Sequence, residues 1–391
     1  MQPTPIPQKI PTVAMAVAAG FGVANLYYCQ PLLAMIEQAF PHSHLAPFIP
    51  SATQLGYVFG LILCLPLGDL VDRRRLIVVQ FGILAGTLVF AAMAPSAPTL
   101  LLASLLVGAA CSVAQQIVPF AAALASDSNR GAIVGKVMSG VLCGILLGRT
   151  VAGFIATWFG WRATFWTAVP AMLVAGALMA MTLPSRPPVS RIGYRAAVAS
   201  LADLWEEEPV LRRAALTQAC LFGSFSVFWT VLSLRLAEPL FHLGADAAGL
   251  FALLGVVGIM AAPVSGHIAD KHGPSLVVQL GALVTLLSWL AFGLWNSILG
   301  MIVGVTVLDF GVQSSIVSNQ HKIYALRPDA RSRINTIFMS GIFIGGTIGS
   351  AGATTFYHLA GWVPVCLFGA AMASLALVLQ FTGKPERLSE V

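Results

Sequence analysis

Short polar breaks divide the chain into twelve apolar runs of roughly 20 residues each, and no other feature limits the fold so strongly. A helix needs about 20 apolar residues to cross the hydrocarbon core of a bilayer. Hydrophobic residues make up 58% of the 391 residues and charged residues only 9%, which excludes an ordinary soluble domain. The runs lack the alternating pattern of a transmembrane barrel, so we expect helices that satisfy their own backbone hydrogen bonds.

We expect six spans in each half of the chain, on either side of the longest polar stretch. In the first half they are expected at about 12–37, 47–69, 76–94, 99–125, 134–156 and 162–183. In the second half they are expected at about 213–236, 246–268, 275–294, 298–324, 334–357 and 362–382. The sequence therefore predicts an all-α polytopic membrane protein with a six-helix bundle over 1–183, a linker over 184–212 and a second six-helix bundle over 213–391.

The basic residues lie in every second loop instead of gathering in one patch. They occur near residues 73–75, 130, 186–213, 271, 327–333 and 384–387. Cytoplasmic loops of membrane proteins carry an excess of Lys and Arg, so we expect these loops, the linker and both termini in the cytoplasm. The formal charge of +6 then reflects membrane topology. We expect the lipid bilayer, and not a nucleic acid, as the macromolecular partner.

The two halves of the chain repeat one another at an offset of 201 positions. The matched residues are Arg130 with Arg331, Met138-Ser139-Gly140 with Met339-Ser340-Gly341, Gly144 with Gly345, Gly148 with Gly349, and Gly160-Trp161 with Gly361-Trp362. Such an ordered set of matches indicates a duplicated unit. Two parallel halves related by an axis along the membrane normal are typical of secondary transporters.

A charged turn follows the second expected span. It reads Gly68-x-Leu70-x-Asp72-Arg73 and continues with two more arginines, the second being Arg75. This turn resembles the signature between the second and third helices of the major facilitator superfamily, with Arg75 where that family usually has Gly. The resemblance covers essentially the whole chain and implies the major facilitator fold of twelve helices in two pseudo-symmetric bundles.

A matching turn in the second half reads Gly266-x-Ile268-Ala269-Asp270-Lys271. The resemblance implies that both turns act as gates. Their glycines would let neighbouring helices approach closely, and Asp72 would face the positive N-terminal end of the eleventh helix. The alternative is that the basic residues only anchor the topology. The gating candidates are Gly68, Asp72, Arg73, Arg75, Gly266, Asp270 and Lys271.

The fifth expected span carries Gly140, Gly144, Gly148 and Gly153, a stripe of small residues suited to close helix packing. It resembles a motif of antiporters in the family's drug and small-solute efflux branch, but Arg149 stands where that motif usually has Pro. An arginine at this depth costs on the order of 2.5–3.5 kcal/mol on insertion scales, so it should face protein or water. Either Arg149 pairs with polar backbone, or it holds the two halves together in one state and releases them in another.

Asp309 lies about eleven residues into the tenth expected span, near mid-membrane at about 1.5 Å per residue. It is the only carboxylate that the sequence places so deep. Burial removes water from a carboxylate and favours its protonated form, which suits a proton-coupling site. The alternative is a hydrogen-bonded structural Asp. We expect Asp309 and Arg149 to carry proton coupling, whereas Glu37 lies at a span end and is expected to be a solvated surface charge.

Polar or aromatic residues recur at helical spacing in four of the spans. They are Asn25, Tyr28 and Gln30 in the first, Ser112, Gln115 and Gln116 in the fourth, Phe222, Phe225 and Trp229 in the seventh, and Gln313, Asn319 and Gln320 in the tenth. The family resemblance implies that these four helices line a central cavity. Amides and one carboxylate between aromatic walls suit a small amphipathic organic solute. Packing in the core or against lipid is the alternative for the aromatic residues.

Together these features predict a proton-coupled secondary transporter that exports a small organic solute or drug by alternating access, without a cofactor. The alternatives are a proton-coupled uptake symporter or a facilitator of a solute such as a sugar or nucleoside. More remote alternatives are a transport-like receptor and a polytopic membrane enzyme, but no catalytic or nucleotide-binding motif is found. His42-x-His44 is too little for a metal site. The resemblance further implies a monomer in a bacterial cytoplasmic membrane.

Overall fold

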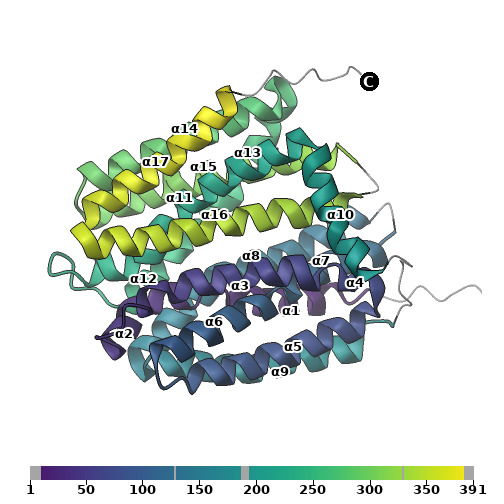
Figure 1. Cartoon of the computed structure of the whole chain (residues 1–391), viewed down its shortest axis with the longest axis horizontal. Coiled ribbons are helices and arrows are strands. Elements are labelled where there is room, and N and C mark those ends of the chain that lie inside the picture. The colour runs from purple at the N-terminus through teal and green to yellow at the C-terminus, as the bar shows by residue number, and fades with distance from the viewer. Residues whose placement is uncertain (1–9, 127–128, 186–192, 328–329, 383–391) are drawn as a thin grey trace, which may run out of the picture.

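The computed structural model describes residues 10–126, 129–185, 193–327 and 330–382. Every regular element in these ranges is a helix, and twelve segments are long and apolar enough to cross a membrane. The helices of the first half of the chain lie together below those of the second half in Figure 1. The expected all-α fold of twelve spans in two bundles is therefore confirmed.

The spans follow one another along the chain with short connections. The first six are built from α1 (Thr12–Ala24), α2 (Cys29–Ala39), η1 (Ala46–Phe48), α3 (Ile49–Cys64), α4 (Leu67–Leu70), α5 (Arg73–Ala92), α6 (Ala97–Cys111), α7 (Val113–Leu124), α8 (Arg130–Phe159) and α9 (Trp161–Thr182). The expected linker contains one helix, α10 (Tyr194–Glu207). The last six are built from α11 (Pro209–Ala237), α12 (Ala245–Phe251), η2 (Ala252–Gly255), α13 (Val256–His272), α14 (Pro274–Leu294), α15 (Ile298–Tyr324), α16 (Arg331–Ala360) and α17 (Trp362–Phe381).

The sequence repeat corresponds to a repeated helix contact. A Cβ added at Gly144 of α8 would lie 2.2 Å from the carbonyl oxygen of Gly20 in α1. A Cβ added at Gly345 of α16 would lie 2.0 Å from the carbonyl oxygen of Ala219 in α11. Any larger residue would push these helices apart, so α8 packs on α1 as α16 packs on α11. The duplicated unit is therefore present in the structure as well as in the sequence.

The two ends of the molecule differ in how the bundles meet. We call the end with α4 and α10 the signature side, and the end with α2 and α12 the far side (right and left in Figure 1). On the far side, the Thr150 hydroxyl of α8 donates to the Gly249 carbonyl of α12 (2.9 Å), and the Thr157 hydroxyl accepts from the Asp246 N–H (3.1 Å). The bundles are therefore closed against each other on the far side.

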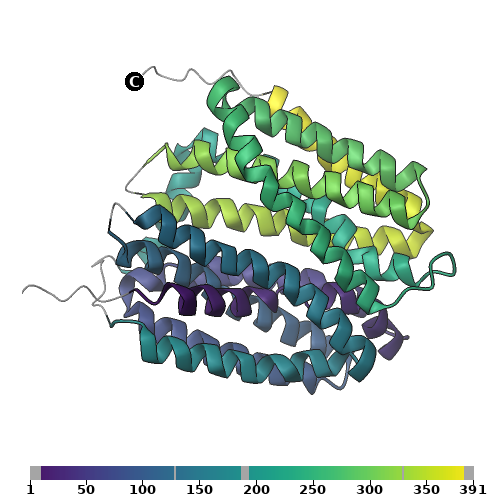
Figure 2. The same ribbon diagram turned by 180° about the vertical axis from the view of Figure 1, so that it is seen from behind.

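The axes of α8 and α13 diverge toward the signature side, as Figure 2 shows from behind. No described atom of the neighbouring elements lies within 4 Å of a Cβ added at Gly131 or Gly135 of α8, or at Gly266 of α13. The same helix α8 is tightly packed toward its other end, at Gly153, where an added Cβ would lie 2.2 Å from the Ala245 carbonyl oxygen. The two bundles thus come closer together toward the far side. We call the interface between the two bundles the seam.

Candidate functional site

Asp309 of α15 is the only carboxylate among the buried side chains of the described residues, with 4% of its surface exposed. One carboxylate oxygen accepts a hydrogen bond from the indole N–H of Trp229 in α11 (3.3 Å). The other lies 3.1 Å from the position of a Cβ added at Gly255, at the end of η2. The carboxylate therefore faces the place where α11, α15 and η2 meet.

Arg149 of α8 is also buried, with 2% of its surface exposed. Its Nε donates to the side-chain oxygen of Gln30 in α2 (2.8 Å). Its guanidinium lies over two rings, 4.3 Å from the centroid of Tyr27 and 4.5 Å from that of Trp229, where cation–π attraction holds it. Its Nη2 is buried and has no hydrogen-bond partner among the described residues.

Trp229 contacts both Asp309 and Arg149. Its N–H is bonded to Asp309, while the face of its ring lies against Arg149 from the other bundle. Within the described residues no ion pair joins Asp309 directly to Arg149. A buried guanidinium without a directly paired anion is costly. Asp309 and Arg149 thus both contact the Trp229 ring, at the seam between the bundles.

The aromatic residues expected in the seventh span form a continuous row on α11. Phe222 stacks on Phe225 at 5.1 Å between centroids, and Phe225 contacts Trp229 at 5.9 Å. At the other end of the row, Phe222 contacts Phe343 of α16, which lies 4.5 Å from the ring of Tyr57 in the first bundle. The row therefore runs along the seam and ends at the Arg149 and Asp309 pair.

Three of the expected cavity amides are only partly buried. Gln115 of α7 contacts Tyr57, and Gln313 of α15 packs against Gly258 of α13. Gln320, two helical turns from Gln313, is also half-buried. Gln30 is hydrogen-bonded to Arg149. Together with Gln30, these three amides come closest to the cavity lining that the sequence predicts.

Other expected cavity residues lie inside one bundle. The Asn25 side chain donates to the Phe21 carbonyl (2.7 Å) in its own helix, Ser112 accepts from Gln80 (3.3 Å), and Asn319 donates to Gln218 (3.1 Å). Each satisfies part of its hydrogen-bonding capacity within its bundle. The structure therefore does not bring them to Asp309.

Tyr28 and Gln116 also point elsewhere. Tyr28 lines a groove between α1 and α8. Gln116 donates to the Cys64 carbonyl (2.6 Å), at the end of α3 where the second span breaks. A Cβ added at Gly68 would lie 2.4 Å from the Gln116 side-chain oxygen. Gln116 thus supports the signature turn, and Gly68 leaves room for it.

Asp72 caps its own helix in this conformation. It accepts from the backbone N–H of Arg74 (2.9 Å) at the start of α5, and from the hydroxyl of Ser185. Arg73 donates from Nε to the Gly68 carbonyl (2.7 Å). These contacts order the turn within the first bundle. A gate role for Asp72 against α16 stays a prediction.

The remaining gating candidates do not pack against described residues of the other bundle in this conformation. Arg75, Asp270 and Lys271 are exposed, and Gly266 has open space beside it. The close approach expected at Gly266 is therefore not present in this conformation, because α13 diverges from α8 on this side. Their gate roles stay predictions.

The glycines of the fifth span pack as expected, but against two different partners. Gly140, Gly144 and Gly148 meet α1 of the same bundle, whereas Gly153 meets α12 of the other bundle. Sequence periodicity gives one stripe and cannot show that its last member crosses the seam.

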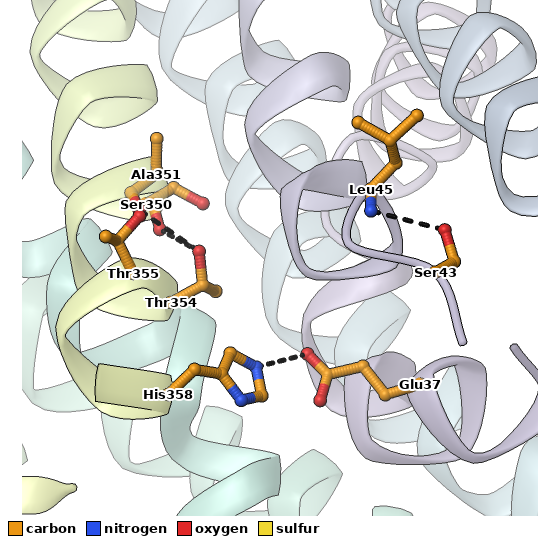
Figure 3. A network of polar contacts seen from close by, with 8 residues as sticks. All are labelled: Glu37, Ser43, Leu45, Ser350, Ala351, Thr354, Thr355 and His358. Atoms are coloured by element: carbon orange, nitrogen blue, oxygen red, sulfur yellow. Dashed lines mark hydrogen bonds and ion pairs between the residues drawn. The ribbon is translucent and has the colours of Figure 1, made fainter. Parts of the chain in front are cut away.

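The sequence does not predict one contact between the bundles, that of Glu37 with His358. Glu37 was expected as a solvated surface charge, but it is half-buried and pairs with His358 of α16 (3.1 Å; Figure 3). The two residues are 321 positions apart, and neither belongs to a motif. The sequence carries no signal that would join them.

The comparisons with known proteins agree with this architecture. The family model of the Major Facilitator Superfamily matches residues 12–319 and 214–390. The transporter YgaY of Escherichia coli (strain K12) is 40% identical over 375 residues, covering 95% of each chain.

Two solved structures share the fold. One is a bacterial homologue of the human lysosomal transporter Spinster, in an inward-facing and occupied conformation, with a TM-score of 0.73, 13% identity and 95% of each chain covered. The other is the xylose transporter XylE of E. coli, partially occluded and inward open, with a TM-score of 0.73, 15% identity, and 97% of this chain and 98% of that chain covered. With the matched family model and the YgaY relative, the chain belongs to the Major Facilitator Superfamily of transporters.

Proposed function

We propose that this transporter exports a small organic solute in exchange for protons. The observation that carries the proposal is the arrangement of Asp309, Trp229 and Arg149 at the seam between the bundles. In this proposal Asp309 takes up and releases the proton. Arg149 is the cation whose attraction to Asp309 changes when that proton arrives.

The physical link between the proton and the movement is electrostatic. An ionised Asp309 attracts Arg149 across the Trp229 ring, and a site with little water screens that attraction weakly. Protonation of Asp309 removes the attraction. Because Arg149 belongs to α8 and Asp309 to α15, the change acts between the two bundles. This is what alternating access requires of a coupling group.

The solute site in this proposal lies along the aromatic row of α11. Phe222 and Phe225 offer flat apolar surface, and the half-buried amides Gln115 and Gln313 offer hydrogen bonds from both bundles. Such walls suit a small amphipathic solute. The glycine stripe of α8, with its resemblance to the antiporter motif, supports exchange over uptake.

The charge pattern supports one orientation in the membrane. We place the signature side and both termini in the cytoplasm of a bacterium, because the basic loops lie there. The structure, closed on the far side, is then inward-facing. The solved neighbours described as inward-facing or inward open support this assignment. We expect a monomer to be the transporting unit, since the site is formed by a single chain.

A proton-release assay tests the proposal. Purified protein in weakly buffered detergent is mixed with drugs, sugars and nucleosides one at a time, and binding is measured separately by calorimetry. We expect protons to be released with a compound that binds, and no release from Asp309→Asn with the same compound. Asp203→Asn, which removes an exposed carboxylate of α10, is the matched control and should release protons normally.

The outcomes separate exchange from its alternatives. Binding without proton release in the unaltered protein contradicts exchange and favours a symporter or a facilitator. Proton release that persists in Asp309→Asn contradicts the assignment of Asp309.

A further inference from the structure

The far-side ends of α2 and α16 are joined across the seam by one side-chain pair. His358 Nε2 lies 3.1 Å from a carboxylate oxygen of Glu37 (Figure 3). Glu37 belongs to the first bundle and His358 to the second. The contact therefore exists only while the two bundles are close together on this side.

Both partners lie beside well-packed parts of the structure. On the Glu37 side, Leu33 and Ile36 of α2 are completely buried in the core. On the His358 side, the preceding Tyr357 donates to Glu238 at the end of α11 (2.6 Å). Because α2 belongs to the first bundle and α16 to the second, separation of the bundles on this side would break the pair.

The pair stands in a groove that is open to the far side. This groove has a volume of about 480 Å³, and its walls include Phe40, His44 and Thr354. The His358 side chain is 45% exposed and that of Glu37 is 18% exposed. Protons from the far-side solution can therefore reach the imidazole directly.

The strength of the contact depends on the charge of the imidazole. A protonated histidine forms an ion pair with a carboxylate, whereas a neutral one keeps at most a hydrogen bond. Histidine side chains change charge between about pH 5 and 8. The other titratable groups around the pair are His44 across the groove, Glu238 and Tyr357 beside it, and Arg235, which pairs with Glu238.

We propose that Glu37 and His358 form a proton-sensitive latch that holds the far side closed. Protons on the far side charge His358, strengthen its bond to Glu37 and keep the bundles together there. Loss of that proton weakens the bond and makes opening easier. The latch is separate from the proposed coupling group, since it needs no proton on Asp309.

Hydrogen exchange by mass spectrometry tests the latch on the purified full chain at pH 5.5 and 7.5, after correction for the intrinsic exchange rates. In the unaltered protein we expect η1, the start of α3 and the far end of α16 to exchange about two- to fivefold more slowly at the lower pH. This range corresponds to a partly exposed ion pair. In Glu37→Gln and His358→Gln, each combined with Asp309→Asn so that the proposed coupling group cannot respond to pH, the difference between the two pH values should disappear.

Two further variants distinguish a latch from a general effect of pH. His358→Arg carries a permanent charge and should keep exchange slow at both pH values. His44→Gln removes the other histidine of the groove and should keep the difference of the unaltered protein. A pH difference that persists in both Glu37→Gln and His358→Gln when each is combined with Asp309→Asn, or one that is lost in His44→Gln, overturns the proposal.

Discussion

Gly153 is the place where a single methyl group should change which side of the transporter is open. It lies on α8, and an added Cβ would be 2.2 Å from the carbonyl oxygen of Ala245 in α12, which belongs to the other bundle. Ordinary contact begins at 3.4 Å, so α8 and α12 would have to separate by about 1.2 Å, which is 3.4 minus 2.2. Gly153→Ala therefore destabilises the conformation in which the far side is closed.

The size of the effect follows from the cost of overpacking. Forcing an extra methyl group into a well-packed contact costs about 1–3 kcal/mol. The clash is present when the far side is closed and absent when the bundles separate there. It should therefore shift the conformational equilibrium about 5- to 150-fold toward far-side opening.

Hydrogen exchange at the two ends of the molecule measures this shift. In Gly153→Ala we expect faster exchange in α12 and slower exchange in the signature-side half of α13. Opposite changes at the two ends indicate movement of whole bundles, because a local clash would only speed exchange near the substitution.

Two matched glycines serve as controls. Gly144→Ala creates the same 2.2 Å clash, but with Gly20 inside one bundle, so it should lower the melting temperature without shifting exchange between the two sides. Gly135→Ala has no described atom within 4 Å and should do neither. If Gly153→Ala and Gly144→Ala give the same exchange pattern, the argument from the seam is wrong.

Three other substitutions, with one control variant, test the stability of other contacts described above. Arg149→Met should leave the melting temperature unchanged or raise it, because a buried cation with an unpartnered nitrogen is replaced by an apolar side chain, while proton-coupled transport is lost; a large fall in melting temperature would contradict this. Gln116→Leu leaves the Cys64 carbonyl without its side-chain donor and should lower the free energy of unfolding by about 1–3 kcal/mol in denaturant titration. Asp72→Ala removes a helix cap and should cost about 0.5–2 kcal/mol in the same titration, whereas Arg75→Ala at an exposed position should cost little; equal losses would argue against the cap.

Much of the fold could be predicted from the sequence, because its signals are local or periodic. A span is a run of apolar residues of fixed length, and the repeat of Gly144 in Gly345 is visible at a constant offset. The positions of Asp309 and Trp229 followed from counting residues along a helix. Their hydrogen bond joins two helices that the family resemblance had already placed at the cavity.

The contacts that the sequence could not predict depend on how each helix is rotated and how the bundles meet. Asn25, Ser112 and Asn319 sit on the polar stripes, yet each finds a partner inside its own bundle. A polar residue in a membrane helix needs only some hydrogen-bond partner, and the sequence does not say which. The pairing of Glu37 with His358 depends on the conformation as well, so no pattern along the chain contains it.

Two parts of the seam that close the far side are unlike each other. At the offset of the repeat, Gly153 of α8 corresponds to Thr354 of α16. The glycine is pressed against backbone, whereas the threonine, itself buried, lies beside a groove that opens to solution. The approach to one part of the seam is open to solution, whereas the other part is tightly packed. The far side should therefore separate first at the α2 and α16 edge, and the tightly packed contact of α8 and α12 should separate last.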